Sequence, residues 1–287
     1  MRLADFTLRH SPFWCIHLFQ CDGVDIRRVT VDAHMGNNDA IDIESTRNVL
    51  IEDCTLSPGD DIVCIKSGRD RDGRRRARPT ENVVVRRVTA DSGHAFLGIG
   101  SELSGGLRNI LMEDCAMEGT CDYIFRLKTT PTRGGFVENV TMRRITAKHA
   151  SVNAVDFNTA YYTDAASVVK TEVAPTTVKG VHLEDISVES AERRVELRSP
   201  PAWPIEDFVI DGLKVHRTSK PDVIENVPVR ELPVTGSARP ADFDRFWADA
   251  KAKYDREVPV DVKLEKVGAL SDAEEDVFKV TVTSPHG

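Results

Sequence analysis

Two acidic clusters are the residues of this chain that are best suited to chemistry. The first is the run Asn37–Asp42, and the second is Gly59-Asp60-Asp61, which precedes an apolar stretch. Adjacent carboxylates such as Asp60 and Asp61 repel each other when both are ionised. Carboxyl groups whose pKa values are pushed apart can serve as a proton donor and as a base or nucleophile, which glycoside hydrolysis requires. An isolated Asp-Asp pair is more often a solvated turn, so the surrounding pattern has to decide.

An internal repeat supplies the elements that position these acids. Seven segments share two short apolar stretches that flank a polar pair; they begin at Val24, Val49, Val83, Ile110, Val140, Val181 and Phe208. Asparagine precedes several of them, at positions 48, 82, 109 and 139. A single short strand cannot bury its apolar face, whereas stacked copies form a continuous core. The repeat therefore predicts an all-β chain, a right-handed parallel β-helix (solenoid), rather than an antiparallel sandwich of similar strand content.

Further polar residues fall at the same phase of this repeat. His94 follows a glycine at a strand start, and Arg126 and Lys128 lie two residues apart, so that both side chains point to one face of a strand. Taken singly, such a histidine is more often a turn or core residue, and such a cation pair is usually a solvated face. Equal phase in a solenoid means stacking in space. One groove is therefore predicted to carry Asp39, Asp60, Asp61, His94, Arg126 and Lys128.

Composition narrows the classes of function. The 287 residues carry a net charge of −8, which argues against nucleic acid, and no apolar run approaches the length of a membrane span. The six cysteines are too few for a disulfide framework in a chain this long, and no histidine or cysteine cluster has metal spacing. Cys54 and Cys115 occupy the same position of their repeats and are expected to point inward. The stretch Arg69–Arg78 is locally basic and is expected to be a long loop, either solvated or a cationic lip that attracts a polyanion.

Four motifs in series resemble glycoside hydrolase family 28, the polygalacturonase family. The family order is Asn-Thr-Asp, Gly-Asp-Asp, Gly-His-Gly and Arg-Ile-Lys. Here the order reads Asn37-Asn38-Asp39, Gly59-Asp60-Asp61, Gly93-His94-Ala95 and Arg126-Leu127-Lys128. The resemblance covers residues 1–215. It implies hydrolysis of α-1,4-galacturonosyl linkages in pectic polysaccharide by an inverting two-carboxylate mechanism, without a cofactor or metal and without nucleic acid or membrane as a partner.

The resemblance also implies a role for each site residue. Asp60 resembles the general acid, and Asp39 and Asp61 resemble the pair that activates water, with the carboxylates set wide enough for that water. His94 is expected to support the protonation state of the acid. The remaining residues are expected to contact substrate, with the cations holding the uronate carboxylate: Asn37, Arg126, Lys128 and either Tyr161 or Tyr162.

The chain departs from the family pattern in three places. Ala95 replaces the second glycine of Gly-His-Gly and Phe96 adds bulk beside it, which is expected to reshape the subsite. The family has further coils before the point where this sequence starts, so residues 1–217 are expected to form a β-helix that lacks its first coils. Residues 218–238 read as a linker. Residues 239–287 are expected to form a short α/β appendage, because Pro240–Trp247 resembles the opening of acetyl xylan esterase-type hydrolases.

Several alternatives remain open at this level. A relative that acts on rhamnogalacturonan, an inactive remnant and a carbohydrate-binding β-helix all share the pattern. A β-helical lyase is less consistent, because lyases commonly use calcium held by carboxylates. The resemblance implies a secreted or periplasmic protein, although Met1–Leu8 reads as a strand and lacks the apolar core of a signal peptide. The sequence leaves endo and exo cleavage undecided.

Overall fold

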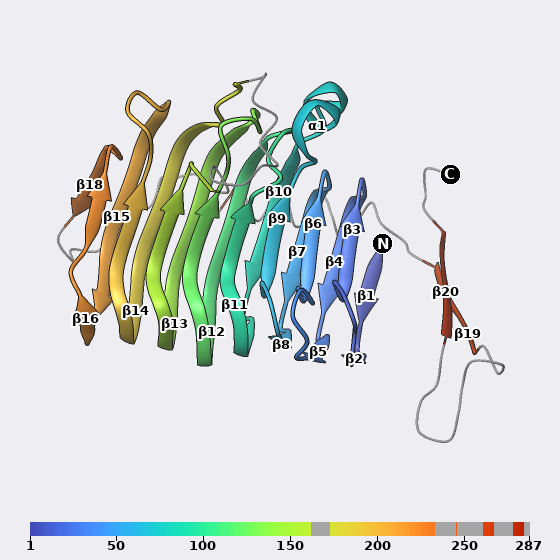
Figure 1. Cartoon of the computed structure of the whole chain (residues 1–287). Coiled ribbons are helices and arrows are strands. Elements are labelled where there is room, and N and C mark those ends of the chain that lie inside the picture. Colours follow the sequence, from blue (N-terminus) through green and yellow to red (C-terminus); the bar gives the residue numbers. More distant parts are fainter. Residues whose placement is uncertain (162–172, 233–244, 246–260, 267–277, 284–287) are drawn as a thin grey trace.

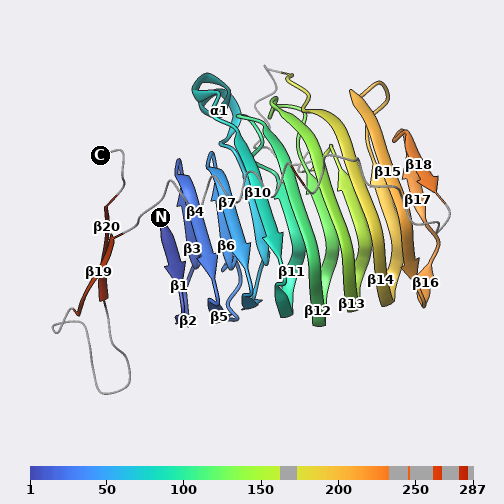
Figure 2. The same cartoon turned by 180° about the vertical axis from the view of Figure 1, so that it is seen from behind.

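The computed structural model describes residues 1–161, 173–232, 245, 261–266 and 278–283. Strands β1 to β18 form one continuous sheet in which every pairing is parallel, and the sheet winds into a right-handed β-helix (Figures 1 and 2). The fold predicted from the repeat is therefore confirmed. Each coil carries strands on three faces, because the chain turns twice within it. Each strand then pairs with its counterpart in the preceding coil.

The first face, which we call the site sheet, carries the acidic clusters. It contains β3 (Ile16–Phe19), β6 (Ile41–Glu44), β9 (Val63–Lys66), β17 (Val223–Glu225) and the carboxyl-terminal parts of β11 (Thr89–Gly100), β12 (Leu107–Lys128), β13 (Phe136–Asn158) and β14 (Thr177–Arg198). Along its strands, residues alternate between the core and the outer face, as the period of a strand requires.

The other two faces close the coil. The second contains β1 (Arg2–Ala4), β4 (Asp22–Arg27), β7 (Arg47–Glu52), β10 (Thr80–Arg86), β15 (Ile205–Val215), β18 (Val229–Leu232) and the starts of β12, β13 and β14. The third contains β2 (Thr7–Arg9), β5 (Thr30–Ala33), β8 (Thr55–Pro58), the start of β11 and β16 (Thr218–Lys220). The three faces enclose one apolar core of stacked valine, isoleucine, leucine and phenylalanine side chains.

Asparagine residues stack along one edge of the second face. Asn48, Asn82, Asn109 and Asn139 all adopt the left-handed conformation, with φ between 54° and 59°. The amides of Asn82, Asn109 and Asn139 each donate to the asparagine of the coil before, over 3.0, 3.0 and 2.9 Å. Asparagine tolerates this conformation because its short side chain forms such local hydrogen bonds. This ladder explains why asparagine recurs before the repeats.

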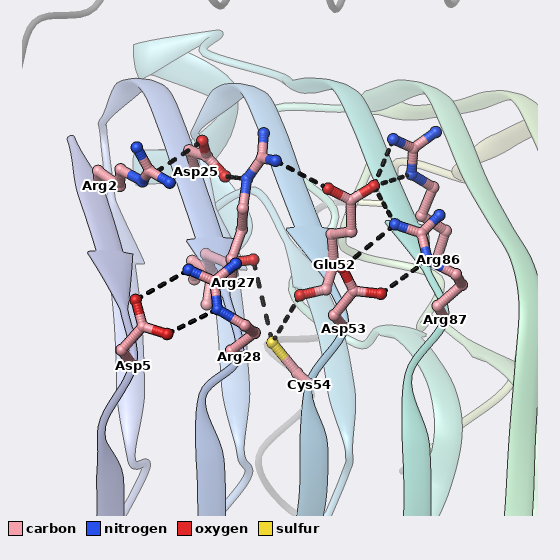
Figure 3. Close-up of polar contacts among 11 residues, drawn as sticks. Arg2, Asp5, Asp25, Arg27, Arg28, Glu52, Asp53, Cys54, Arg86 and Arg87 are labelled. Carbon is pink, nitrogen blue, oxygen red and sulfur yellow. Dashed lines mark hydrogen bonds and ion pairs between the residues drawn. The ribbon is translucent and has the colours of Figure 1, made fainter.

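The polar pair inside each repeat forms a second ladder, which we call the charge ladder. Successive coils place Arg27 opposite Glu52, Glu52 opposite Arg86, Arg86 opposite Glu113 and Glu113 opposite Arg143. The neighbouring residues alternate in the same way, and Arg28 reaches Asp5 at 2.6 and 2.8 Å, as Arg87 reaches Asp53 at 2.7 and 3.2 Å (Figure 3). Cationic and anionic coils therefore alternate, and each charge meets an opposite charge.

Two expectations about segments need correction. The stretch expected as a loop contains a helix, α1 (Asp70–Arg76), because Asp72 pairs with Arg75 and Arg76 one turn later at 3.1 and 2.9 Å. The segment expected as a linker continues the solenoid to Leu232, since β16, β17 and β18 pair with β14 and β15. Parallel pairing with a finished coil orders strands that are too short and too polar to be recognised alone.

The last part of the chain is described only in two strands. β19 (Asp261–Lys266) and β20 (Phe278–Thr283) form an antiparallel pair within the expected appendage. The segment Pro240–Trp247, on which the expectation of that appendage rests, lies outside the described residues except for Arg245. Cys54 and Cys115 are buried as expected, and all six cysteines are free thiols. Among the described residues, no helix is both long and apolar enough to cross a membrane.

Candidate active site

Glycine residues open a space at the centre of the site sheet. Strand pairing aligns Asp42, Cys64, Gly98 and Arg126 in one outward row across four coils. A Cβ atom at Gly98 would lie 2.7 Å from Oδ2 of Asp61, so only glycine leaves room for that carboxylate above the strand. The acidic cluster therefore sits where the row has no side chain, and cations flank it on both sides.

Asn38 ties the two acidic clusters together. Its side chain is fully buried, accepts a hydrogen bond from the backbone of Gly59 at 2.8 Å and donates one to the carbonyl of Ser11 at 3.1 Å. Gly59 in turn must be glycine, because a Cβ there would lie 2.2 Å from the carbonyl oxygen of Met35. These contacts set Asp39 and Asp60 in a fixed relation, and the sequence analysis did not single out Asn38.

Asp60 and Asp61 differ in environment despite being adjacent. Burial, together with the charges of Asp61 and Asp39, raises the pKa of Asp60 above its ordinary value. Asp61 is more deeply buried, which opposes ionisation, but the Lys128 ammonium 3.2 Å away, the charge of His94 and a hydrogen bond from Cys64 outweigh that effect and lower its pKa. The pair is thus arranged to hold one proton, on Asp60, beside one ionised carboxylate.

Asp39 also faces Asp61, the ionised carboxylate of that pair. Oxygen atoms of Asp39 and Asp61 lie within 4.8 Å of each other, a gap that one water molecule can bridge with two hydrogen bonds of about 2.8 Å. The second oxygen of Asp61, Oδ1, is buried and has no hydrogen-bond partner in the described residues. A buried carboxylate oxygen of this kind is suited to receive a hydrogen bond from a water or a substrate hydroxyl.

His94 joins the acids to Arg126. Its Nδ1 lies 2.7 Å from Asp122, and its Nε2 faces Nη1 of Arg126. Because guanidinium can only donate, a hydrogen bond at this contact requires Nε2 to accept. Both ring nitrogens therefore have partners other than Asp60. Support of Asp60 was expected from a hydrogen bond or from the charge of the ring. The described residues show no such hydrogen bond, although a His94 atom lies within 4.8 Å of Asp60, and the charge of His94 acts to lower the pKa of Asp60.

Arg126 and Lys128 form the cationic side of the space. Arg126 is only 9% exposed and contacts Asp156 at 3.3 Å, while its guanidinium lies 4.2 Å from the ring centre of Tyr123 and 5.4 Å from that of Tyr161. Lys128 reaches Asp61 and lies 5.8 Å from the Tyr161 ring. Tyr161 is therefore at the site, as one of the two expected tyrosines, and Tyr162 lies outside the described residues.

The remaining expectations divide in two. Asp39, Asp60, Asp61, His94, Arg126 and Lys128 are linked by the contacts above, so the structure brings all six together. Asn37 is exposed, and the buried amide of the motif is Asn38 instead. Ala95 and Phe96 are fully buried, and Phe96 packs in the core, so neither reshapes the open face as expected. Phe96 and the next residue, Leu97, both pack in the core, so the alternation of the strand is interrupted before Gly98, which faces outward.

The structure adds residues that the motifs did not indicate. Lys66 pairs with Asp39 at 3.1 Å and also with Asp42, and Asp122 and Asp156 hold His94 and Arg126. Two groups have ligand-type atoms within 4.8 Å of one another, namely Asp39/Asp61/Cys64 and Asp60/Asp61/His94. Lys66 and Lys128 already neutralise carboxylates of both groups, so the donor set does not call for a metal.

Comparisons with known proteins agree with this geometry. The profile described as glycosyl hydrolases family 28 matches residues 1–235. The chain belongs to this family. It is 30% identical to a probable polygalacturonase of Vitis vinifera over 223 residues, which cover 77% of this chain and 45% of that protein. It is 25% identical to an endo-polygalacturonase of Pectobacterium carotovorum subsp. carotovorum, over 72% of this chain and 52% of that protein.

Solved structures of family members show the same fold. A hyperthermoactive exopolygalacturonase from Thermotoga maritima superposes with a TM-score of 0.75 at 29% identity, covering 83% of this chain and 52% of that one. A polygalacturonase from Erwinia carotovora superposes with a TM-score of 0.63 at 21% identity. The chain spans about half the length of the relatives that it matches.

Proposed function

We propose that this chain hydrolyses the α-1,4-galacturonosyl linkages of pectic polysaccharide, with polygalacturonate as its substrate. The observation that carries the proposal is the Asp60–Asp61 pair, in which one carboxyl group is biased to keep its proton and the other to lose it. Membership of family 28 and the similarity to polygalacturonases support the substrate class.

The mechanism follows from these protonation states. Asp60 gives its proton to the leaving glycosidic oxygen as the bond from that oxygen to the anomeric carbon breaks. Asp39 and Asp61 orient one water molecule, whose oxygen bonds to the anomeric carbon while one of its protons passes to a carboxylate. A general acid of this kind typically contributes a rate factor of about 10²–10⁴.

Asp39, the third carboxylate of the cluster, is the residue on which the proposed inversion at the anomeric carbon depends. Oxygen atoms of Asp60 and Asp61 come within 4.8 Å of each other, and an inverting enzyme needs room for a water on the face of the sugar ring opposite its acid. Asp39 supports inversion because it offers, with Asp61, a place for the water. Proton NMR of the first-formed product tests this point, since the inverting reaction releases the β-anomer from an α-linkage.

Recognition of the uronate carboxylate is proposed for Arg126 and Lys128. Both cations border the acidic cluster and both lie near the Tyr161 ring. Their charge complements a carboxylate, and charge-assisted hydrogen bonds are stronger than neutral ones. Asn37 and Tyr162 remain proposed substrate contacts by their places in the family motifs.

The decisive experiment is incubation of the purified chain with polygalacturonate. New reducing ends that are absent with Asp60→Asn support hydrolysis, and the product sizes separate endo from exo cleavage. Unsaturated products that absorb ultraviolet light would instead identify a lyase. Cleavage of rhamnogalacturonan alone would move the substrate to that polymer. Binding without any cleavage would favour the carbohydrate-binding or remnant alternative.

The end of the chain carries a separate proposal. Because Pro240–Trp247 resembles the opening of acetyl xylan esterase-type hydrolases, we propose that residues 239–287 belong to such a domain. A crystal structure in which this segment packs as a further coil of the β-helix would overturn that assignment.

A further inference from the structure

Lys66 is a buried cation enclosed by three groups. It ends strand β9, is 5% exposed, and its Nζ lies 3.1 Å from Oδ2 of Asp39. The same ammonium donates to Oδ1 of Asp42, and it lies 3.6 Å from the centre of the Trp14 ring. An ammonium group has three N–H donors, and an aromatic face attracts its charge. Lys66 is therefore held on three sides, and Asp39 is held by it.

The charges of this cluster do not balance if both acids are ionised. One ammonium faces two carboxyl groups, and Asp42 is fully buried. Burial, with the neighbouring charge of Asp39, raises the pKa of Asp42 to about 8 in spite of Lys66. Its other oxygen, Oδ2, has no hydrogen-bond partner in the described residues. Below neutral pH, Asp42 therefore keeps its proton, and the charge of Lys66 is left for Asp39.

The groups around Asp42 come from three directions. His17 of β3 and Cys64 of β9 are its partners in register on the adjacent strands, and Lys66 and Asp39 contact the same cluster. Cys15 is close enough for the charges of Asp39 and Asp42 to raise the pKa of its thiol, after burial. Lys66 is the one cation among these groups whose charge does not depend on pH near neutrality.

We propose that Lys66 and Asp42 are positioning residues for Asp39, with Lys66 orienting its carboxylate and supplying the opposite charge beside it while Asp42 anchors the ammonium from the opposite side. This inference rests on the proposed hydrolysis, in which Asp39 helps to orient water. The arrangement repeats on the other carboxylate of the pair, where Lys128 holds Asp61 at 3.2 Å. Each water-orienting acid then has its own lysine, and Asp60, which has none, remains the proton donor.

The first test is the pH dependence of polygalacturonate cleavage by Lys66→Met. Removing an opposite charge at this distance raises a carboxyl pKa by about 1–3 units. The acidic limb of kcat/KM is therefore expected to move up by at least about one unit, because Asp39 must be ionised to act. Lys66→Arg, which keeps the charge, is expected to restore the wild-type limb, which a purely structural role does not predict.

A matched control separates this effect from loss of a buried ion pair in general. Arg143 is 4% exposed and pairs with Glu113 at 2.6 Å on the charge ladder, away from the site sheet. Arg143→Met is expected to lower stability while leaving the acidic limb in place. If Lys66→Met leaves the limb within about 0.2 units of wild type, or if Arg143→Met moves it equally, the positioning role is overturned.

The second test needs no activity, so it stands if the proposed function fails. The folded-state pKa of Asp42 lies above its unfolded value of 3.8, so unfolding releases a proton between those values and stability falls as pH rises from about 4 to 8. Asp42→Asn abolishes this titration. The stability of the variant relative to wild type is expected to rise across that window in thermal unfolding, and a constant difference would overturn the role of Asp42. Absence of cleavage by wild type would overturn the proposed function alone.

Discussion

The charge ladder and the site sheet are both built by stacking coils, but the stacking arranges charged residues in opposite ways in the two regions. On the ladder each coil carries charges opposite to those of the next, so that Glu52 lies among Arg27, Arg86 and Arg87. On the site sheet the coils bring like charges together, because Asp39 interacts with Asp42 on one side and with Asp60 and Asp61 on the other. The carboxyl pKa of Asp53 and of Glu52 is lowered on the ladder, whereas that of Asp42 and Asp60 is raised at the site.

This difference separates structural charge from functional charge. On the ladder both oxygens of Asp53 accept hydrogen bonds from the Arg87 guanidinium. At the site, Oδ2 of Asp42 and Oδ1 of Asp61 are buried and have no hydrogen-bond partner among the residues that the structure describes. A buried polar atom without a partner costs free energy, so its retention points to a task other than stability. Variants on the two regions should therefore fail in different ways.

The largest effect is expected from Asp60→Asn. Loss of the proton donor should lower kcat on polygalacturonate by about 10²–10⁴-fold and leave substrate affinity nearly unchanged. Reducing-end assays give kcat, and calorimetry gives affinity. Asp53→Asn makes the same chemical change on the ladder and should keep kcat within about twofold, because exposed ion pairs contribute little. A residual rate above about a tenth for Asp60→Asn would remove it as the acid.

Glu52→Gln is expected to give the largest loss of stability without a catalytic defect. Breaking a buried ion pair costs about 3–5 kcal/mol, and Glu52 is 2% exposed. Hydrogen bonds from Arg87 and Arg86 outweigh burial and lower the pKa of Glu52, so its stabilisation is present above the unfolded value of 4.5 and disappears as pH falls below it. Urea unfolding at pH 7 and pH 3 measures both.

A surface pair provides the comparison for this loss. Glu118 and Lys148 lie 3.2 Å apart but are about half exposed, so Glu118→Gln should cost less than about 1 kcal/mol. Equal costs for Glu52→Gln and Glu118→Gln would show that burial does not distinguish the ladder.

Lys128→Ala tests a cation that serves both substrate and acid. A charge-assisted hydrogen bond contributes roughly 1.5–3 kcal/mol, so kcat/KM on polygalacturonate should fall about 10–150-fold, and by less on the methyl ester, which has no anion to pair. The acidic limb should also rise, because Lys128 lowers the pKa of Asp61. Equal losses on both polymers would remove the carboxylate role and leave only the effect on Asp61.

Asn109→Ala is expected to have the smallest effect. The change removes two ladder hydrogen bonds, of 3.0 Å to Asn82 and 2.9 Å from Asn139, and places alanine at φ 57°. The cost should be about 1–2 kcal/mol in urea unfolding, with kcat unchanged. Asn109→Gly, which tolerates the conformation, should recover part of that loss. If glycine costs as much as alanine, backbone strain makes no contribution.

The fold and the acidic residues of the site could be predicted from local sequence patterns. Strand alternation and a recurring polar pair are local patterns, and they require stacked coils because no single coil can bury its own apolar face. Four motifs at equal phase then place Asp39, Asp60 and Asp61 together with their cations. These features can be recognised in the linear sequence, because they depend on the spacing of residues within a coil.

The ion-pair partner of each charged side chain, by contrast, could be read only from the three-dimensional structure. Lys66 meets Asp39 across 27 residues and Lys128 meets Asp61 across 67, and both pairings depend on strand register and on the glycine at position 98. The strands from Thr218 to Leu232 likewise exist because a finished coil offers them backbone partners. Local spacing does not encode such contacts, since loops of different lengths between coils change the sequence separation without changing the register.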